Sequence, residues 1–430
     1  MLALYGFLTI ALLLILIMSK KVSVIVALIA IPIITGLLAG FDNELVGFIS
    51  DGVKNISTTV VMFVFAILFF GVLMDAGTFD PVIAKTLKLA GSDPVKITLA
   101  TAFLAMLVHL DGSGAVTFLI VIPALLPIYD KLGMQRTSLA CIVALAAGTM
   151  NILPWGGPTI RAASALSIPV TELFNPLLIP VIVGLITVFA IAYMIGKKER
   201  KNINWSNQSS SLPIQAKREK DLSVKVGVMI FNYLLIVSSI VIIITALAPP
   251  YIVFMVAFVL ALVVNFPKVT EQKERVDAHA KAALLMASIL FAAGCFTGIL
   301  KGSGMIEAMA QSSVKYIPDF IGSHLAVSTG LLSMPASLLF DPDSYYFGVM
   351  PILANTAEHF GGSAIEVGRA SIIGQMTTGF PVSPLTGSTY LLIGLSEVDL
   401  GTHQKKTIPL AFLVTLVILV VSVLIGTISL

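Results

Sequence analysis

Apolar stretches long enough to cross a lipid bilayer follow one another along almost the whole chain. A helix needs about 20 apolar residues to span the hydrocarbon of a membrane. A chain that is 57% hydrophobic and 11% charged, with a mean hydropathy of +1.01, fits neither a soluble nor a nucleic-acid-binding protein. We therefore predict an all-α polytopic membrane protein. Its ten expected crossings lie at roughly 2–18, 22–40, 57–76, 136–166, 173–195, 226–246, 250–266, 280–300, 363–396 and 407–428.

Two further apolar segments, roughly 95–132 and 320–360, each carry an aspartate beside a helix breaker. The first contains Asp-Gly-Ser-Gly at 111–114, and the second contains Asp-Pro-Asp-Ser at 341–344. An ionisable residue flanked by this much hydrocarbon marks a functional site by default. Irregular backbone at membrane depth has to be satisfied by protein or by a watery cavity. We therefore predict two re-entrant hairpins whose tips face one internal site.

A second break follows each aspartate at the same distance. Pro154 opens a Pro-Trp-Gly-Gly-Pro break 43 residues after Asp111, and Pro384 closes a Pro-Val-Ser-Pro break 43 residues after Asp341. Matching interruptions in two halves of a chain point to the binding site of a secondary transporter. The expected broken helices cover 136–166 and 363–396.

One long hydrophilic connection, 196–225, divides the chain into two parts, 1–195 and 226–430. Each part has five expected crossings and one hairpin. An odd number of crossings makes the second part run through the membrane in the opposite sense to the first. We therefore predict two inverted five-span repeats, joined by a cytoplasmic linker.

The basic residues predict the orientation, because Lys and Arg concentrate on the cytoplasmic side. With Lys20 and Lys21 inside, all but five of the 26 basic residues are cytoplasmic. This arrangement places both termini outside the cell. The first hairpin then enters from the cytoplasm and the second from outside. The five exceptions are Lys54, Arg161, Lys301, Lys315 and Arg369.

The breaks also predict the kind of ligand. Asp111 or Asp341 can cap a returning hairpin arm, Pro342 suits a first helical position, and Pro158 and Pro384 suit the restart of the broken helices. Four helix N-termini that meet near the midplane would form an anion site from backbone N–H groups. We predict that a small, oxygen-rich anion is bound by Ser113, Gly114, Thr117, Asn151, Gly156, Gly157, Thr159, Arg161, Ser344, Ser383, Thr386 and Ser388.

Three carboxylates at this site, those of Asp111, Asp341 and Asp343, would repel an anion unless a positive charge accompanies it. That charge can be a proton, a co-transported cation or a metal on the ligand. Hard oxygen ligands suit Mg²⁺ or Ca²⁺, and the lack of a His/Cys cluster argues against a dedicated zinc site. We assign the three aspartates to metal or proton coupling and predict no resident cofactor.

The sequence resembles the metal-citrate:proton symporter (CitMHS) family along nearly its whole length. The motifs that carry the resemblance lie at 111–114, 151–159, 341–348 and 374–386. The resemblance implies proton-coupled uptake of citrate complexed with a divalent metal across a bacterial plasma membrane. It also implies a homodimer with a scaffold and a transport domain that works by an elevator motion. In that setting Arg161 either binds a citrate carboxylate or extends outward to the interface.

The related sodium-coupled dicarboxylate carriers have Ser-Asn-Thr at their hairpin tips, where this chain has Asp-Gly-Ser and Asp-Pro-Asp. Within this fold, a proton- or sodium-coupled carrier of uncomplexed di- or tricarboxylate is the main alternative. A cation/proton antiporter also uses broken helices and buried aspartate, but it does not need hydroxyl-rich anion pockets. An intramembrane aspartyl protease is a distant alternative, because neither aspartate has the Tyr-Asp or Gly-x-Gly-Asp context of that class.

Overall fold

The computed structural model describes residues 1–19, 21–203 and 226–430, and every regular element within these ranges is helical. Among the described residues, seven helices are long and apolar enough to cross a membrane. The prediction of an all-α, multi-pass membrane protein is therefore confirmed. Lys20 and most of the expected cytoplasmic linker, 204–225, lie outside the described residues. The helix before the linker continues to Asn202, so the start of the linker is helical.

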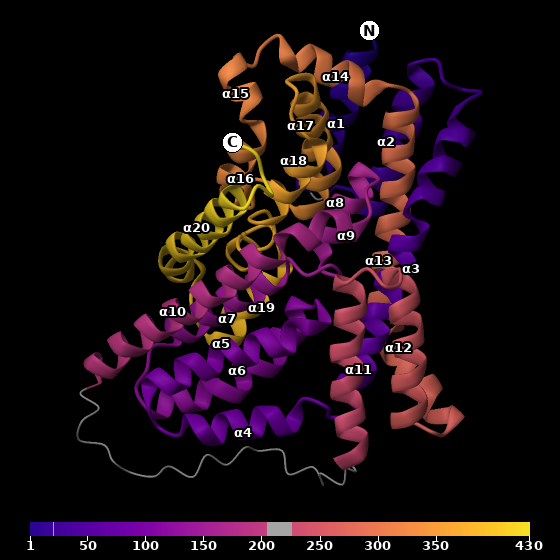
Figure 1. Cartoon of the computed structure of the whole chain (residues 1–430). Coiled ribbons are helices and arrows are strands. Elements are labelled where there is room, and N and C mark those ends of the chain that lie inside the picture. The colour runs from indigo at the N-terminus through magenta and orange to yellow at the C-terminus, as the bar shows by residue number, and fades with distance from the viewer. Residues whose placement is uncertain (20, 204–225) are drawn as a thin grey trace.

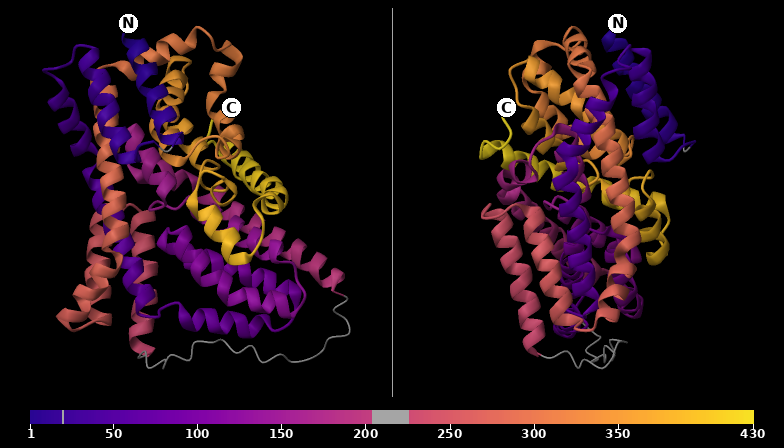
Figure 2. Two further views of the ribbon diagram at one scale, coloured as in Figure 1. Left: turned by 180° about the vertical axis from the view of Figure 1, so that it is seen from behind. Right: turned by 90° about the vertical axis from the view of Figure 1, so that its right-hand side faces the viewer.

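Two very long helices, α3 (Leu45–Asp75) and α13 (Val269–Gly302), run side by side through the molecule (Figures 1 and 2). Both are longer than their apolar stretches, because each helix continues into a polar segment whose charged residues, such as Asp51 and Lys273, are exposed. A Cβ on Gly52 would lie 2.0 Å from the carbonyl oxygen of Gly294, so the two backbones touch. Around this pair lie α1 (Leu2–Met18), α2 (Val24–Leu38), α11 (Val226–Ile244) and α12 (Pro250–Asn265).

The other elements follow the same order twice: a short helix, two arms, a helix interrupted by a break, and a long last helix. The short helices α4 and α14 lie at opposite ends of the molecule (Figure 1). The first series is α4 (Asp80–Ala90), α5 (Pro94–Val108) with η1 (His109–Asp111), α6 (Gly114–Lys131), α7 (Arg136–Met150), α8 (Gly157–Leu166), α9 (Val170–Phe174) with η2 (Asn175–Leu177), and α10 (Leu178–Asn202). The second is α14 (Met305–Val314), α15 (Asp319–Ser323), α16 (Leu325–Ala336), η4 (Ser344–Val349), α17 (Met350–His359), α18 (Ala364–Ile372), η5 (Phe380–Val382), α19 (Gly387–Ser396) and α20 (Leu400–Leu424).

Side-chain caps fix where several of these helices begin. The Asp93 carboxylate accepts a hydrogen bond from Val95 N at 3.0 Å ahead of α5, and Pro94 occupies the first helical position. The Asp399 carboxylate accepts one from Thr402 N at 3.1 Å ahead of α20. These caps satisfy amide groups that the helix itself leaves without a partner.

The two broken helices differ in the length of their interruptions. In the first, α7 ends at Met150 and α8 begins at Gly157, with Pro158 in its first turn as predicted. In the second, α18 ends at Ile372 and α19 begins at Gly387. The helix therefore restarts three residues after Pro384, and the prediction that this proline opens the helix is wrong. The intervening chain forms turns and the short η5 instead.

Candidate functional site

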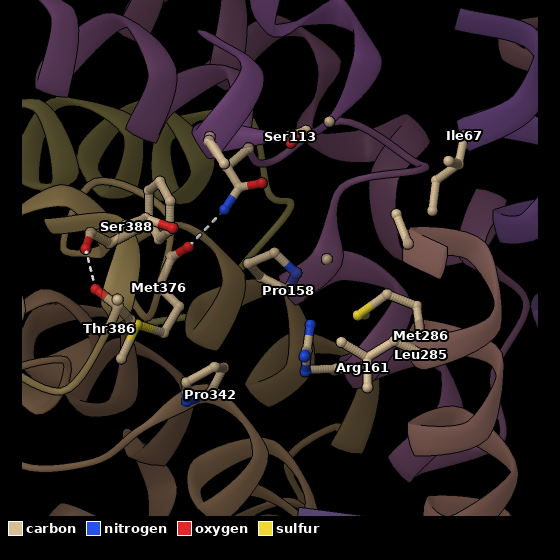
Figure 3. A pocket seen from close by; sticks show the side chains of 18 of the residues that line it. Ile67, Ser113, Pro158, Arg161, Leu285, Met286, Pro342, Met376, Thr386 and Ser388 are labelled. Atoms are coloured by element: carbon tan, nitrogen blue, oxygen red, sulfur yellow. Dashed lines mark hydrogen bonds between the residues drawn. The ribbon is translucent and has the colours of Figure 1, made fainter. Parts of the chain in front are cut away.

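A cavity of about 720 Å³ lies where the two arm-to-arm turns and the two helix breaks meet. Its wall includes the starts of four helical segments, at Gly114, Gly157, Pro342 and Gly387. Figure 3 shows Arg161 near Pro158 and Leu285–Met286, with Pro342, Thr386 and Ser388 across the cavity. The first amide groups of each helix lack intrahelical partners, so their positive ends favour an anion here.

The first tip, residues 109–113, turns at a glycine. Gly112 has a φ of 73°, in the left-handed region that glycine enters without a Cβ clash. The Asp111 carboxylate accepts a hydrogen bond from Ser113 N at 2.8 Å. Trp155 Nε1, in the break between α7 and α8, donates to Leu110 O at 2.7 Å. The first broken helix therefore holds the first tip in place.

At the second tip, residues 337–343, the aspartate accepts more hydrogen bonds from its own turn than Asp111 does at the first tip. Asp341 Oδ1 accepts hydrogen bonds from the amides of Asp343 and Ser344, both at 3.0 Å. Ser344 Oγ donates to Asp341 Oδ2 at 2.5 Å. The chain then continues through the π-helical η4, a geometry often found at functional sites. Asp341 thus acts as a cap and also lines the cavity.

One ion pair joins the two series of elements at the cavity. Arg161 Nε, on α8, donates to Asp343 Oδ1 at 2.7 Å. Arg161 is 8% exposed and Asp343 is 6% exposed, and both line the cavity. The expectation that Arg161 extends outward to the interface is therefore wrong. A second link between the series runs from Asn151 Nδ2 to Met376 O at 2.8 Å, between the two breaks.

Most of the predicted site residues come together in this cavity, and the others hold the breaks in shape. Those that line it are Asp111, Ser113, Gly114, Asn151, Gly157, Arg161, Asp341, Asp343, Thr386 and Ser388. The predicted residues outside its lining are Thr117, Gly156, Thr159, Ser344 and Ser383.

The hydroxyls outside the lining bond to groups of the tips and breaks themselves. Thr159 Oγ1 donates to Ile152 O at 2.9 Å, and Ser383 Oγ donates to Ser337 O at 2.5 Å. Thr117 Oγ1 donates to Ser113 O at 2.9 Å. Gly156 is required sterically, because a Cβ there would lie 2.1 Å from Asn151 O. Buried backbone carbonyls need such partners, so a hydroxyl near a break is not by itself a ligand contact.

The sequence did not indicate the contribution of the two long helices to the cavity. Phe63 and Ile67 of α3 and Met286 of α13 line it, yet in the sequence they belong to ordinary membrane-spanning runs. His279 of α13 also lines it, and its Nε2 lies 3.1 Å from Asp75 Oδ2 at the end of α3. No sequence pattern links the two residues, because they are 204 positions apart.

The three aspartates of the cavity do not form a ready-made metal site. Over the described ranges, no group of three or more His, Cys, Asp or Glu residues could hold a metal ion. The carboxylates of Asp111, Asp341 and Asp343 therefore do not converge as one set of three ligands. Arg161 is the one Arg or Lys among the described residues that line the cavity.

Comparison with solved structures establishes the class of the fold. The YdaH transporter of Alcanivorax borkumensis matches with a TM-score of 0.62 at 15% sequence identity, over 91% of this chain and 88% of that one. MtrF of Neisseria gonorrhoeae matches with a TM-score of 0.59 at 13% identity, over 88% and 84%. At these identities the likeness concerns the fold alone. The protein has the fold of multi-pass membrane transporters.

The CitMHS model, which describes citrate transporters, matches residues 9–374, and the chain belongs to this family. A citrate transporter of Bacillus subtilis (strain 168) is 45% identical over the full length of both chains. The Mg(2+)/citrate complex secondary transporter of the same organism is 40% identical over 100% of this chain and 99% of that one. The predicted family is confirmed, and the protein is a transporter and not an enzyme, which removes the aspartyl protease alternative.

Proposed function

We propose that this protein is a secondary active transporter that takes up citrate complexed with a divalent metal, coupled to protons. The observation that carries the proposal is the charge of the cavity. Among the described residues that line it, three are aspartates, Asp111, Asp341 and Asp343, and Arg161 is the one Arg or Lys. An anion enters such a site favourably only when a positive charge accompanies it.

The cavity offers separate groups for the two parts of the complex. Arg161 and the amides of the helix starts at Gly114, Gly157 and Gly387 suit the carboxylates of citrate, whereas the amides that follow Pro342 are already bonded to Asp341. The hydroxyls of Ser113 and Ser388 and the amide of Asn151 suit its hydroxyl and remaining oxygens. The aspartate oxygens suit a hard cation that citrate already holds. We therefore assign substrate contact to these polar groups and metal or proton coupling to Asp111, Asp341 and Asp343.

Mg²⁺ or Ca²⁺ is the metal that an all-oxygen environment favours. The relative named as a Mg(2+)/citrate complex secondary transporter supports this choice by its 40% identity. The metal belongs to the substrate, and citrate supplies several of its ligands. Protons are proposed as the coupling ion because an aspartate in a membrane cavity can take up and release one.

We further propose that the two series of elements are inverted repeats and that α5–α6 and α16–α17 are re-entrant hairpins. The matching order of elements and the opposite positions of α4 and α14 support this. In this proposal the bundle around α3 and α13 is a scaffold, through which two copies form a homodimer. The hairpins and broken helices form a transport domain that moves as an elevator. The protein lies in the bacterial plasma membrane with both termini outside.

Uptake of labelled citrate into proteoliposomes tests the proposal. We expect uptake to require Mg²⁺ or Ca²⁺ and an inward proton gradient, and to stop in excess chelator. Equal uptake with and without chelator would exclude the metal complex and favour a carrier of uncomplexed tricarboxylate, to which the helix starts at Gly114, Gly157 and Gly387 are also suited. Uptake that ignores a protonophore would exclude proton coupling.

A further inference from the structure

The ion pair between Arg161 and Asp343 occupies the very groups that the substrate needs. Arg161 comes from α8 and Asp343 from the second tip, 182 residues later, and the bond between them is 2.7 Å long. Their side chains are only 10% and 9% exposed. Both residues still line the cavity, so a ligand can reach them. Arg161, the one Arg or Lys among the described residues that line the cavity, is therefore already paired with a carboxylate.

We propose that this ion pair selects metal-bound citrate over free citrate. The inference rests on the proposed function, because it concerns how the same cavity distinguishes two forms of its substrate. A citrate carboxylate that binds Arg161 through two parallel hydrogen bonds, one of them from Nε, displaces Asp343 from that nitrogen. Asp343 is then a buried carboxylate without a counter-charge, and two other aspartates share its cavity.

Free citrate and its metal complex differ in what they offer the released aspartate. Free citrate replaces one ion pair by another and leaves Asp343 uncompensated, and a buried charge whose partner has been removed is strongly unfavourable. The complex brings a divalent cation, which can pair with Asp343 while a carboxylate pairs with Arg161. One ion pair is then exchanged for two. Selectivity arises because only the complex compensates both groups.

The decisive variant is Asp343→Asn, which removes the carboxylate but keeps its shape. Binding of citrate to the purified full-length protein in nanodiscs is measured by titration calorimetry, once with EDTA and once with excess Mg²⁺. We expect the wild type to prefer the complex. In Asp343→Asn, affinity for free citrate should rise by at least about tenfold, because Arg161 is released and no buried charge is orphaned. Affinity for the complex should fall, so this variant should no longer prefer metal-bound citrate over free citrate.

Asp75→Asn is the control. It removes one negative charge beside the cavity without touching Arg161, since Asp75 pairs with His279, which lines the cavity, and with Arg275. We expect this variant to keep the wild-type preference for the complex. An equal loss of preference in both variants would show that the net charge of the cavity decides, and would overturn the role of the ion pair.

A second variant covers the case in which Asp343→Asn does not fold with Arg161 left unpaired. The double variant Arg161→Gln/Asp343→Asn leaves neither charge behind, and its thermal unfolding reports whether it folds. We expect it to lose the preference without gaining affinity for free citrate. A double variant that keeps the wild-type preference would refute the inference while the proposed function stands. A wild type without any preference would instead refute the proposed function and the inference together.

Discussion

Each of the two tips of the cavity carries an aspartate, Asp111 or Asp341, and the tips differ in how their carboxylates are used. At the first tip, Asp111 accepts one hydrogen bond, from the amide of Ser113. At the second, Asp341 accepts three, and Asp343 is held in an ion pair with Arg161. The aspartate of the tip thus accepts one hydrogen bond in the first series of elements and three in the second, where an ion pair is added. The second tip is fixed to the opposite series by charge, whereas the first is fixed to its own broken helix through Trp155.

The largest loss of stability is expected when Arg161 is replaced, because this breaks the ion pair that holds the second tip. Arg161→Met leaves Asp343 as a buried, unpaired carboxylate, and we expect the free energy of unfolding to fall by about 3 kcal/mol. Thermal unfolding in detergent measures the loss. The double variant Arg161→Met/Asp343→Leu should recover most of it, because two apolar side chains can replace a buried ion pair. An unchanged melting temperature in Arg161→Met would show that water in the cavity already screens the pair.

Much of the cavity was predictable because helix breakers act locally. Gly112 and Pro342 interrupt apolar runs, and both turns lie where the sequence indicates them. Pro158 also sits in the first turn of its helix as predicted. Backbone geometry at these positions depends on neighbouring residues, so the sequence carries the signal.

Long-range partners were not predictable in the same way. The bond from Arg161 to Asp343 and the contact of His279 with Asp75 join residues 182 and 204 positions apart, and no spacing rule connects them. The hydroxyl of Ser383 showed the opposite difficulty. Its residue type suggested a ligand contact, but it bonds to Ser337 O, because a buried carbonyl at the end of α16 needs a partner inside the protein.

Replacing Asp111 and Asp341 separately tests whether the two tips differ in the number of hydrogen bonds that stabilise them. Asp341→Ala removes the acceptor of two amide bonds and one hydroxyl bond, and we expect a loss of about 2 kcal/mol in the free energy of unfolding. Asp111→Ala removes the acceptor of one bond, and the loss should be below about 1 kcal/mol. Parallel melting curves of the two variants measure the difference. Equal shifts would contradict the comparison and indicate that neighbouring groups take over the bonds at the second tip.

A further effect, smaller than those at Arg161 and Asp341, is expected at the backbone turn that only the first tip needs. Gly112→Ala places a Cβ on a residue with a φ of 73°, and the strain should cost about 1 kcal/mol. The second tip has Pro342 at the matching position, whose fixed negative φ requires no such freedom. Gly387→Ala is the control, because a Cβ there has no atom within 4 Å and its melting temperature should not fall. If both variants melt like the wild type, the first tip can adopt another turn. The single hydrogen bond that Asp111 accepts would then be too weak to fix the turn.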